Sequence, residues 1–105
     1  MLVILKSKKD THFAKGEYDG KGIVVLCGSK INMVDSFDKI PKDVYNMRNS
    51  RKIVNKDGVV LKDIEFNSPT SAAIFVTGRS VNGYIAWRPD DKMSLKEYLK
   101  KQGNK

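Results

Sequence analysis

The sequence predicts an α+β fold, a small antiparallel sheet covered by two or three short helices. Strand-like segments come early in the chain and in neighbouring pairs, whereas the capping signals typical of helices cluster in its second half. The chain has 105 residues, about the length of one domain. We therefore expect residues 1–105 to form a single small basic domain, with only the last few residues, 102–105, frayed.

The first strands are predicted where short apolar segments alternate with turns. Residues 2–6 form a first apolar strand, and residues 12–18 form a second one that ends at the turn 19–22. Residues 23–27 carry the strongest strand pattern, because apolar and mostly β-branched residues lie between two glycines. Since this segment is apolar on both faces, we expect it to be a central strand that is covered on both sides.

Weaker strand patterns follow these three segments. The alternation of Ile31, Met33 and Phe37 predicts a further strand beside the third one. Residues 59–61 and 64–66 are short apolar pieces that we also expect to be strands.

The first helix is expected to begin at Pro41, whose fixed φ suits the first helical position. Val44, Met47 and Val54 fall near one face of this helix, and the stop signal comes at residues 57–58. The helix should be basic as well as amphipathic, because three cationic side chains lie on its other sides: Arg48, Arg51 and Lys52.

The second helix has the clearest boundaries. Ser68 is a favourable N-cap, Pro69 suits the first helical position, and Gly78 can adopt the left-handed conformation that ends a helix. Its apolar face repeats with helical spacing and is formed by Ala72, Phe75 and Val76.

The remaining elements are a strand and a last helix. Residues 82–83 are Asn-Gly, which predicts a tight turn into a strand over residues 84–88. Ser94 and Glu97 form a capping box, in which the two side chains satisfy backbone donors at a helix start. The last helix then presents an apolar face of Leu95, Tyr98 and Leu99.

The charge of the chain favours an anionic partner. There are 20 Lys and Arg residues against 12 Asp and Glu, which gives a net charge of +8. Such a surplus favours nucleic acid through the release of counterions, although a solvated Lys-rich surface explains it equally well. Only 4 of the 20 cations are Arg. Because bidentate reading of guanine favours Arg, the composition favours contacts with the nucleic-acid backbone.

The single cysteine and single histidine limit the chemistry that the chain can perform. With Cys27 alone no intrachain disulfide can form, which is typical of a reducing, cytoplasmic compartment. We expect Cys27 to be a buried thiol and His12 an exposed side chain, so a Cys27–His12 catalytic dyad is the minor alternative. We predict no metal site, no cofactor, no catalytic residues and no membrane span, and we do not expect an enzyme.

Four segments together resemble a known but uncharacterised family. They are residues 22–29, 47–48, 66–73 and 78–87, and the resemblance extends over most of the chain. The family is a domain of unknown function found C-terminal to GIY-YIG nuclease domains and in other bacterial restriction-associated proteins. Residues 68–87 are also similar to the RAMA module, which is associated with restriction enzymes and adenine methylases.

The resemblance implies an accessory module rather than a catalyst. The chain has no GIY-YIG segment, no methyltransferase motif and no phosphate-binding glycine loop. An accessory domain of such enzymes is expected to hold DNA, which is an argument by analogy.

The candidate nucleic-acid-binding residues fall into three groups. The cations of the first helix can follow a phosphate backbone, or they can form a solvated helix face. Two serines near the start of the second helix can offer hydroxyl groups to a phosphate, although capping alone explains the first of them. The loop and strand that follow offer the polar side chains of Arg79 and Asn82 and the aromatic ring of Trp87. In the alternative interpretation, Arg79 is solvated, Asn82 belongs to a turn and Trp87 is a core residue. The candidates are Arg48, Arg51, Lys52, Ser68, Ser71, Arg79, Asn82 and Trp87.

Two functions remain open at this point. The first is a non-catalytic module of a restriction or nuclease system that binds nucleic acid, with DNA favoured, through a basic face. The second is an assembly domain that docks to other protein domains, because an apolar strand over residues 2–6 left at a sheet edge can recruit a partner.

Overall fold

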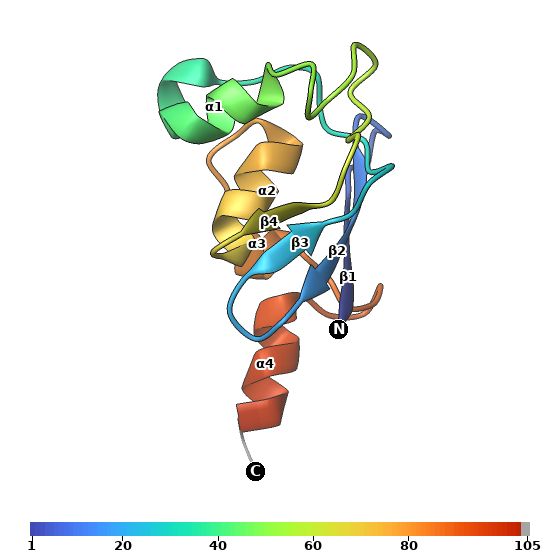
Figure 1. The fold of residues 1–105 in the computed structure, drawn as a ribbon. Coiled ribbons are helices and arrows are strands. Elements are labelled where there is room, and N and C mark those ends of the chain that lie inside the picture. Colours follow the sequence, from blue (N-terminus) through green and yellow to red (C-terminus); the bar gives the residue numbers. More distant parts are fainter. Residues whose placement is uncertain (104–105) are drawn as a thin grey trace.

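The computed structural model describes residues 1–103 and confirms the α+β fold class (Figure 1). Four antiparallel strands form one sheet in the order β1-β2-β3-β4. The strands are β1 (Leu2–Lys6), β2 (Phe13–Tyr18), β3 (Ile23–Val25) and β4 (Ile64–Phe66). The helices are the 3-10 turn η1 (Phe37–Lys39), α1 (Lys42–Arg48), α2 (Pro69–Thr77), α3 (Gly83–Ala86) and α4 (Leu95–Gly103).

The sheet buries one face and leaves the other open to solvent. Burial alternates along β2, where Ala14 and Tyr18 are buried whereas Phe13, Lys15 and Glu17 are exposed. The buried face packs against α2, and the rings of Phe66 on β4 and Phe75 on α2 lie 5.2 Å apart. This alternation follows from the pleat of a strand, in which successive side chains point to opposite faces.

Helix α2 begins and ends as its sequence predicts. The side chain of Ser68 accepts a hydrogen bond from the backbone N–H of Ser71 at 3.1 Å. Pro69 occupies the first turn, and Gly78 ends the helix with a φ of 73°. A side chain at Gly78 would be strained by this φ and would also clash, because its Cβ would lie 2.6 Å from the carbonyl oxygen of Val34.

The third strand is shorter than predicted, and Cys27 is exposed rather than buried. The chain turns directly after Val25, where Ser29 donates a backbone hydrogen bond to Leu26. Gly28, with a φ of 90°, makes this turn possible. The prediction of a core thiol was wrong because the last two residues of the apolar run belong to the turn.

The further strand predicted from Ile31, Met33 and Phe37 is also absent. Lys30 makes isolated bridges with Phe13 and Val59, after which the chain leaves the sheet. The backbone N–H of Asn32 donates instead to Val76 at the end of α2. The residues with this alternating pattern therefore begin a loop that packs against the end of α2.

The first helix ends earlier than predicted, at Arg48. Val54 does not extend its apolar face, because it lies in an isolated bridge with Val60. The turn between them is held by Asn55, whose side-chain oxygen accepts hydrogen bonds from Asp57 and Val59. Residues 59–61, predicted as a strand piece, contribute only such isolated bridges.

The strand predicted over residues 84–88 is wrong, since most of this segment forms the short helix α3. Asn82 caps α3 by accepting a hydrogen bond from the backbone N–H of Tyr84 at 2.9 Å. The helix is favoured over a hairpin because Gly83 packs directly on α2. A Cβ at Gly83 would lie 2.1 Å from the carbonyl of Pro69.

Strand β1 lies at an edge of the sheet, as the assembly hypothesis requires, but its outer side is not fully open. The backbone groups of Ile4 and Arg88 exchange two hydrogen bonds, at 2.8 and 2.9 Å. The segment after α3 therefore occupies the middle of this edge.

The last helix confirms the capping box. The backbone N–H of Glu97 donates to the hydroxyl of Ser94, and that of Ser94 donates to the carboxylate of Glu97, both at 3.2 Å. Helix α4 continues through Gly103, so residues 102–103 are helical rather than frayed. The other two residues of the predicted frayed tail, 104–105, lie outside the described residues. No helix within residues 1–103 combines the length and the apolar character needed to cross a membrane.

Candidate nucleic-acid interface

The C-terminal end of α2 is closed by a buried arginine. Arg48 is only 5% exposed, although the sequence predicted a cation that either follows a phosphate backbone or forms a solvated helix face. Its Nη1 donates to the carbonyl of Phe75 at 2.6 Å, and its Nη2 donates to the carbonyl of Asn32. Its Nε lies 3.5 Å from a carboxylate oxygen of Asp35. Arg48 therefore satisfies the carbonyl of Phe75, which the end of α2 leaves without a partner, and it carries positive charge where the helix dipole favours it.

Asn32 attaches a loop to the same helix end. Its side-chain amide donates to the carbonyl of Thr77 at 3.2 Å, while its side-chain oxygen accepts from the backbone N–H of Val34 at 3.2 Å. Together with the backbone bond from Asn32 to Val76, these contacts hold the loop in one position. The end of α2 and this loop thus form a rigid base, which we call the floor, for the hollow that lies next to them.

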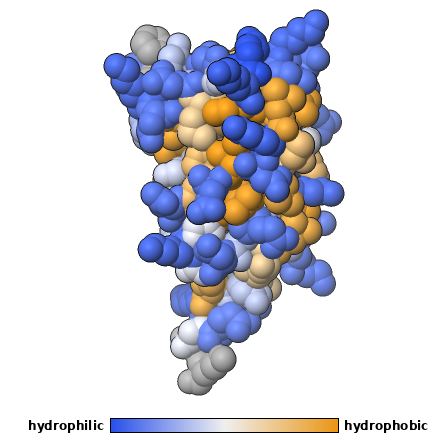
Figure 2. Space-filling view, viewed as in Figure 1, coloured by the Kyte–Doolittle hydropathy of each residue, from blue (hydrophilic) through white to orange (hydrophobic). Residues whose placement is uncertain are grey.

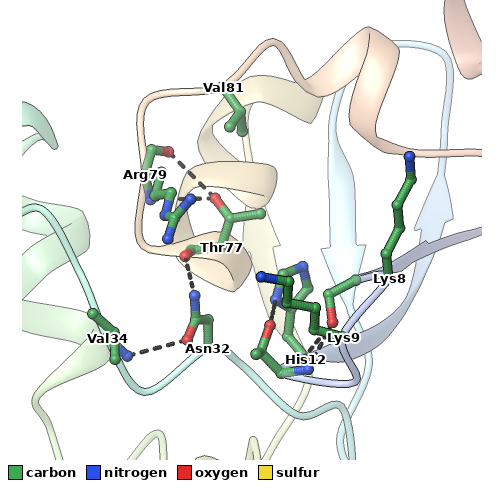
Figure 3. A pocket seen from close by; sticks show the side chains of 10 residues that line it. Lys8, Lys9, His12, Asn32, Val34, Thr77, Arg79 and Val81 are labelled. Carbon is green, nitrogen blue, oxygen red and sulfur yellow. Dashed lines mark hydrogen bonds between the residues drawn. The ribbon is translucent and has the colours of Figure 1, made fainter.

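A hollow of about 510 Å³ lies over this floor, between the β1–β2 turn and the loop after α2 (Figure 3). We call it the basic hollow. Three of its lining residues are cationic and none is acidic, whereas the others are mostly hydroxyl, amide or imidazole side chains. The lining residues are Ser7, Lys8, Lys9, Thr11, His12, Asn32, Val34, Thr77, Arg79 and Val81.

The β1–β2 turn presents two of the three cations. Ser7 organises this turn, because its hydroxyl accepts hydrogen bonds from the backbone N–H groups of Thr11 at 2.6 Å and His12 at 3.3 Å. Lys8 and Lys9 follow Ser7 and are exposed. The turn therefore holds the lysine backbones in place while their ammonium groups stay in solvent and are available to a ligand.

The pKa of His12 reflects both burial and the positive charge around the basic hollow. Its Nδ1 lies 3.0 Å from the hydroxyl of Thr11. Burial lowers the pKa of His12 below its ordinary value of 6.5, and the positive charges of Arg48 and Arg79 lower it further. The imidazole is thus neutral near pH 7 in a positive environment. An anionic ligand would offset the nearby positive charges and favour the protonated imidazole.

The structure brings only one of the predicted site residues into this hollow. Arg79 is exposed and lines it from the loop after α2, opposite the β1–β2 turn (Figure 3). Arg51 and Lys52 are exposed in the turn that follows α1, outside the hollow. They form a second basic cluster together with Lys56.

The other predicted residues lie at the opposite end of α2 and have structural roles. Trp87 is completely buried, and its indole N–H donates to the carbonyl of Pro69 at 3.0 Å. In this position its ring cannot stack on a base. Ser68 and Asn82 cap α2 and α3, and the hydroxyl of Ser68 donates to that of Ser71 at 3.2 Å.

Sequence reasoning missed the cations of the β1–β2 turn. A usable signal was present, because two adjacent lysines lie in a polar segment between two predicted strands. Asn32 carried no such signal, since its role depends on a helix that lies more than forty residues further along the chain. Among residues 1–103, no three His, Cys, Asp or Glu side chains are grouped so that they could hold a metal ion.

The comparisons with known proteins support the resemblance to an uncharacterised domain. The model of a domain of unknown function, DUF4357, matches residues 4–99. The chain belongs to this family. The match runs from β1 into α4, so every residue that lines the basic hollow lies inside the DUF4357 domain. Comparison with curated proteins and with solved structures finds no match.

Proposed function

We propose that this DUF4357 domain is a non-catalytic module that binds nucleic acid, with DNA as the favoured ligand, through the basic hollow. The observation that carries the proposal is the composition of the hollow, in which Lys8, Lys9 and Arg79 face a site lined by no carboxylate. Hydroxyl and amide groups beside the cations can donate hydrogen bonds to phosphate oxygens.

The chemistry of the hollow favours contact with the nucleic-acid backbone. Lysine ammonium groups act as flexible point charges on phosphates. Among the lining residues, Arg79 alone has a planar guanidinium group that can donate two parallel hydrogen bonds. The net charge of +8 adds long-range attraction to any polyanion. Affinity should therefore depend steeply on salt and weakly on base sequence.

We further propose that the module accompanies nuclease or restriction enzymes in the cytoplasm. This part of the proposal is supported by the motif resemblance of residues 66–73 and 78–87 and by the single cysteine. The alternative, an assembly domain that recruits a partner through the edge of β1, has less support because Arg88 already pairs with Ile4 at that edge.

The experiment compares two variants that each remove three positive charges. One is Lys8→Ala, Lys9→Ala and Arg79→Ala in the basic hollow, and the other is Arg51→Ala, Lys52→Ala and Lys56→Ala in the second basic cluster. Binding of each to a labelled duplex DNA is followed by fluorescence anisotropy at about 50 and 200 mM salt, a range over which phosphate contacts weaken strongly.

The wild type should bind, and its affinity should fall steeply with salt. The hollow variant should bind much more weakly, with a slope of log affinity against log salt reduced by about 2–3. The control variant should lose less. Equal losses would contradict the assignment to the hollow, and no binding of the wild type to any DNA or RNA at low salt would overturn the function.

A further inference from the structure

The open face of the sheet carries an exposed aromatic ring surrounded by lysines. The side chain belongs to Phe13 at the start of β2, which is 44% exposed. In the sheet register, Lys6 on β1 lies opposite Phe13 on one side, and Lys30 lies opposite it on the other. Lys15 follows two residues later and therefore points to the same face. The ring thus has cationic neighbours on both flanking segments and on its own strand.

The charges of this face are divided between its two ends. The acidic residues of its strands, Glu17 on β2 and Glu65 on β4, both lie opposite Val24, at the end away from Phe13. Glu17 also forms an ion pair with the N-terminal ammonium group at 3.3 Å. Near Phe13, an ion pair joins Lys6 to Asp91 at 3.9 Å, and both side chains are largely exposed. Asp63 also lies near this end, because its carboxylate accepts a hydrogen bond from the backbone N–H of Cys27 at 2.8 Å. The lysines around the ring still outnumber these carboxylates, so this end of the face is basic and a negatively charged partner fits it.

A second hollow, of about 210 Å³, lies beside the ring. The turn after β3 forms its other wall, and a Cβ added to Gly28 there would meet no atom within 4 Å. Hydrophobic surface lies among hydrophilic groups over the sheet (Figure 2). The lining residues are Phe13, Lys15, Leu26, Cys27, Gly28 and Ser29. The face therefore offers an aromatic surface, open space against it and cations around it.

We propose that this face binds single-stranded nucleic acid, with an unpaired base stacked on Phe13 and the adjacent phosphates contacted by Lys6, Lys15 and Lys30. The inference rests on the proposed function and names the form of nucleic acid that the module prefers. Stacking on an aromatic side chain requires a base that is free of its own stack, which a single strand provides and a duplex does not. His12 lines the basic hollow and its neighbour Phe13 points to the open face, so one hairpin supplies contacts on both sides.

The test compares a labelled oligothymidylate of about 12 nucleotides with a duplex of the same length. The variants are Phe13→Leu, which keeps an apolar side chain on the strand but removes the ring, and Phe13→Trp, which restores an aromatic surface. Ile85→Ala serves as the matched control, because Ile85 is 54% exposed on α3, away from this face.

Wild type should prefer the single strand. Phe13→Leu should weaken single-strand binding at least about fivefold, the effect of losing one base stack, and should leave duplex binding unchanged. Phe13→Trp should restore the preference, and Ile85→Ala should have no effect. A second measurement uses Cys27, the only cysteine, which is exposed in the hollow beside Phe13. Saturating single strand should slow its reaction with a thiol reagent, and saturating duplex should not.

The outcomes separate the two proposals. Duplex binding through the basic hollow with no single-strand preference, or single-strand binding that Phe13→Leu leaves intact, would overturn the inference and leave the proposed function standing. Self-association that Phe13→Leu abolishes, without an effect on oligonucleotides, would assign the face to a second copy of the chain and also overturn it. No binding to either form would overturn both.

Discussion

The backbone groups at the two ends of α2 find different kinds of partner, although the ends are only roughly 12 Å apart. At the N-terminal end, the hydroxyl of Ser68 caps the helix, and the indole of Trp87 donates to Pro69. Ser68 bonds a residue three positions away, whereas Trp87 lies 18 residues from Pro69 and is packed into the core. At the C-terminal end, Arg48 and Asn32 bond the last carbonyl groups, and a hollow with exposed cations lies above them. The N-terminal end is covered by other parts of the protein, and the C-terminal end lies under the basic hollow, where we propose that the ligand binds.

The difference separates the recognisable sequence motif from the surface that we propose for binding. The Ser-Pro and Asn-Gly segments that carry the family resemblance build caps and the close contact between α2 and α3. The cations of the basic hollow come instead from a hairpin turn and from the loop after α2. The following predictions test this division of roles, from the largest expected effect to the smallest.

Removal of the buried arginine should have the largest effect on stability. Arg48→Met leaves the carbonyls of Phe75 and Asn32 without their partner and Asp35 without its counterion. We expect the free energy of unfolding to fall by about 3 kcal/mol or more, as is typical when one partner of a buried charged network is removed.

Urea denaturation followed by circular dichroism measures this loss. Arg51→Met is the matched control, because Arg51 is exposed and its replacement should change the free energy of unfolding by less than about 0.5 kcal/mol. Similar values for the two variants would contradict the structural role of Arg48.

The close contact between α2 and α3 should be nearly as sensitive. In Gly83→Ala, the new Cβ would lie 2.1 Å from the carbonyl of Pro69, so the backbone of one helix must move. We expect a loss of about 3 kcal/mol, the upper part of the range for overpacking. The same substitution at Gly103, where a Cβ meets nothing within 4 Å, should change the free energy of unfolding by about 0.5 kcal/mol or less. Thermal melts of both variants provide the measurement, and equal melting temperatures would disprove the contact.

In the basic hollow at the C-terminal end of α2, replacement of a single exposed cation should weaken binding without changing stability. Arg79→Ala should reduce the slope of log affinity against log salt by about 0.7–0.9, the value for one phosphate contact. Its unfolding curve should match that of the wild type, because Arg79 is exposed. Titrations at several salt concentrations measure the slope. An unchanged slope would remove Arg79 from the interface.

The smallest effect concerns pH. The pKa of His12 is lowered in the folded protein, so the unfolded chain binds the proton more tightly. Stability should therefore be complete above the unfolded pKa of 6.5 and should decrease as the pH falls below it. His12→Gln should remove this part of the pH dependence in denaturant titrations between about pH 5 and 7.5.

Ligand binding should respond to pH in the opposite direction. A polyanion in the hollow favours the protonated imidazole, so DNA affinity should rise as the pH falls toward the lowered pKa of His12 in the free protein, even as the free protein loses stability. A pH-independent affinity that His12→Gln leaves unchanged would indicate that the ligand does not reach His12.

The accuracy of the sequence predictions follows the same division between local and distant partners. The caps of α2 and α4 and strands β1 and β2 were predictable, because each depends on residues within a few positions of one another. Cys27 was placed wrongly because apolar composition does not show where a glycine with positive φ ends a strand. Arg48 was placed wrongly because its carbonyl partners are supplied by segments distant in sequence.

The candidate site was predicted only in part for a related reason. Arg79 was identified from its place in a loop after a helix stop, and the structure places it in the basic hollow. Lys8 and Lys9 join it only because the β1–β2 hairpin brings its turn to the far end of α2. Asn82 was predicted as a binding residue because it shares a loop with Arg79, and Trp87 because its ring can stack on a base, but both have structural roles.

The most direct test of the account is a map of where nucleic acid touches the protein. Backbone amide chemical shifts should be recorded during titration with a short DNA duplex at low salt. We expect the largest changes at Lys8, Lys9, His12 and Arg79, with little change at Ser68 and Ser71. Changes concentrated at the N-terminal end of α2, or in the turn that holds Arg51 and Lys52, would contradict it.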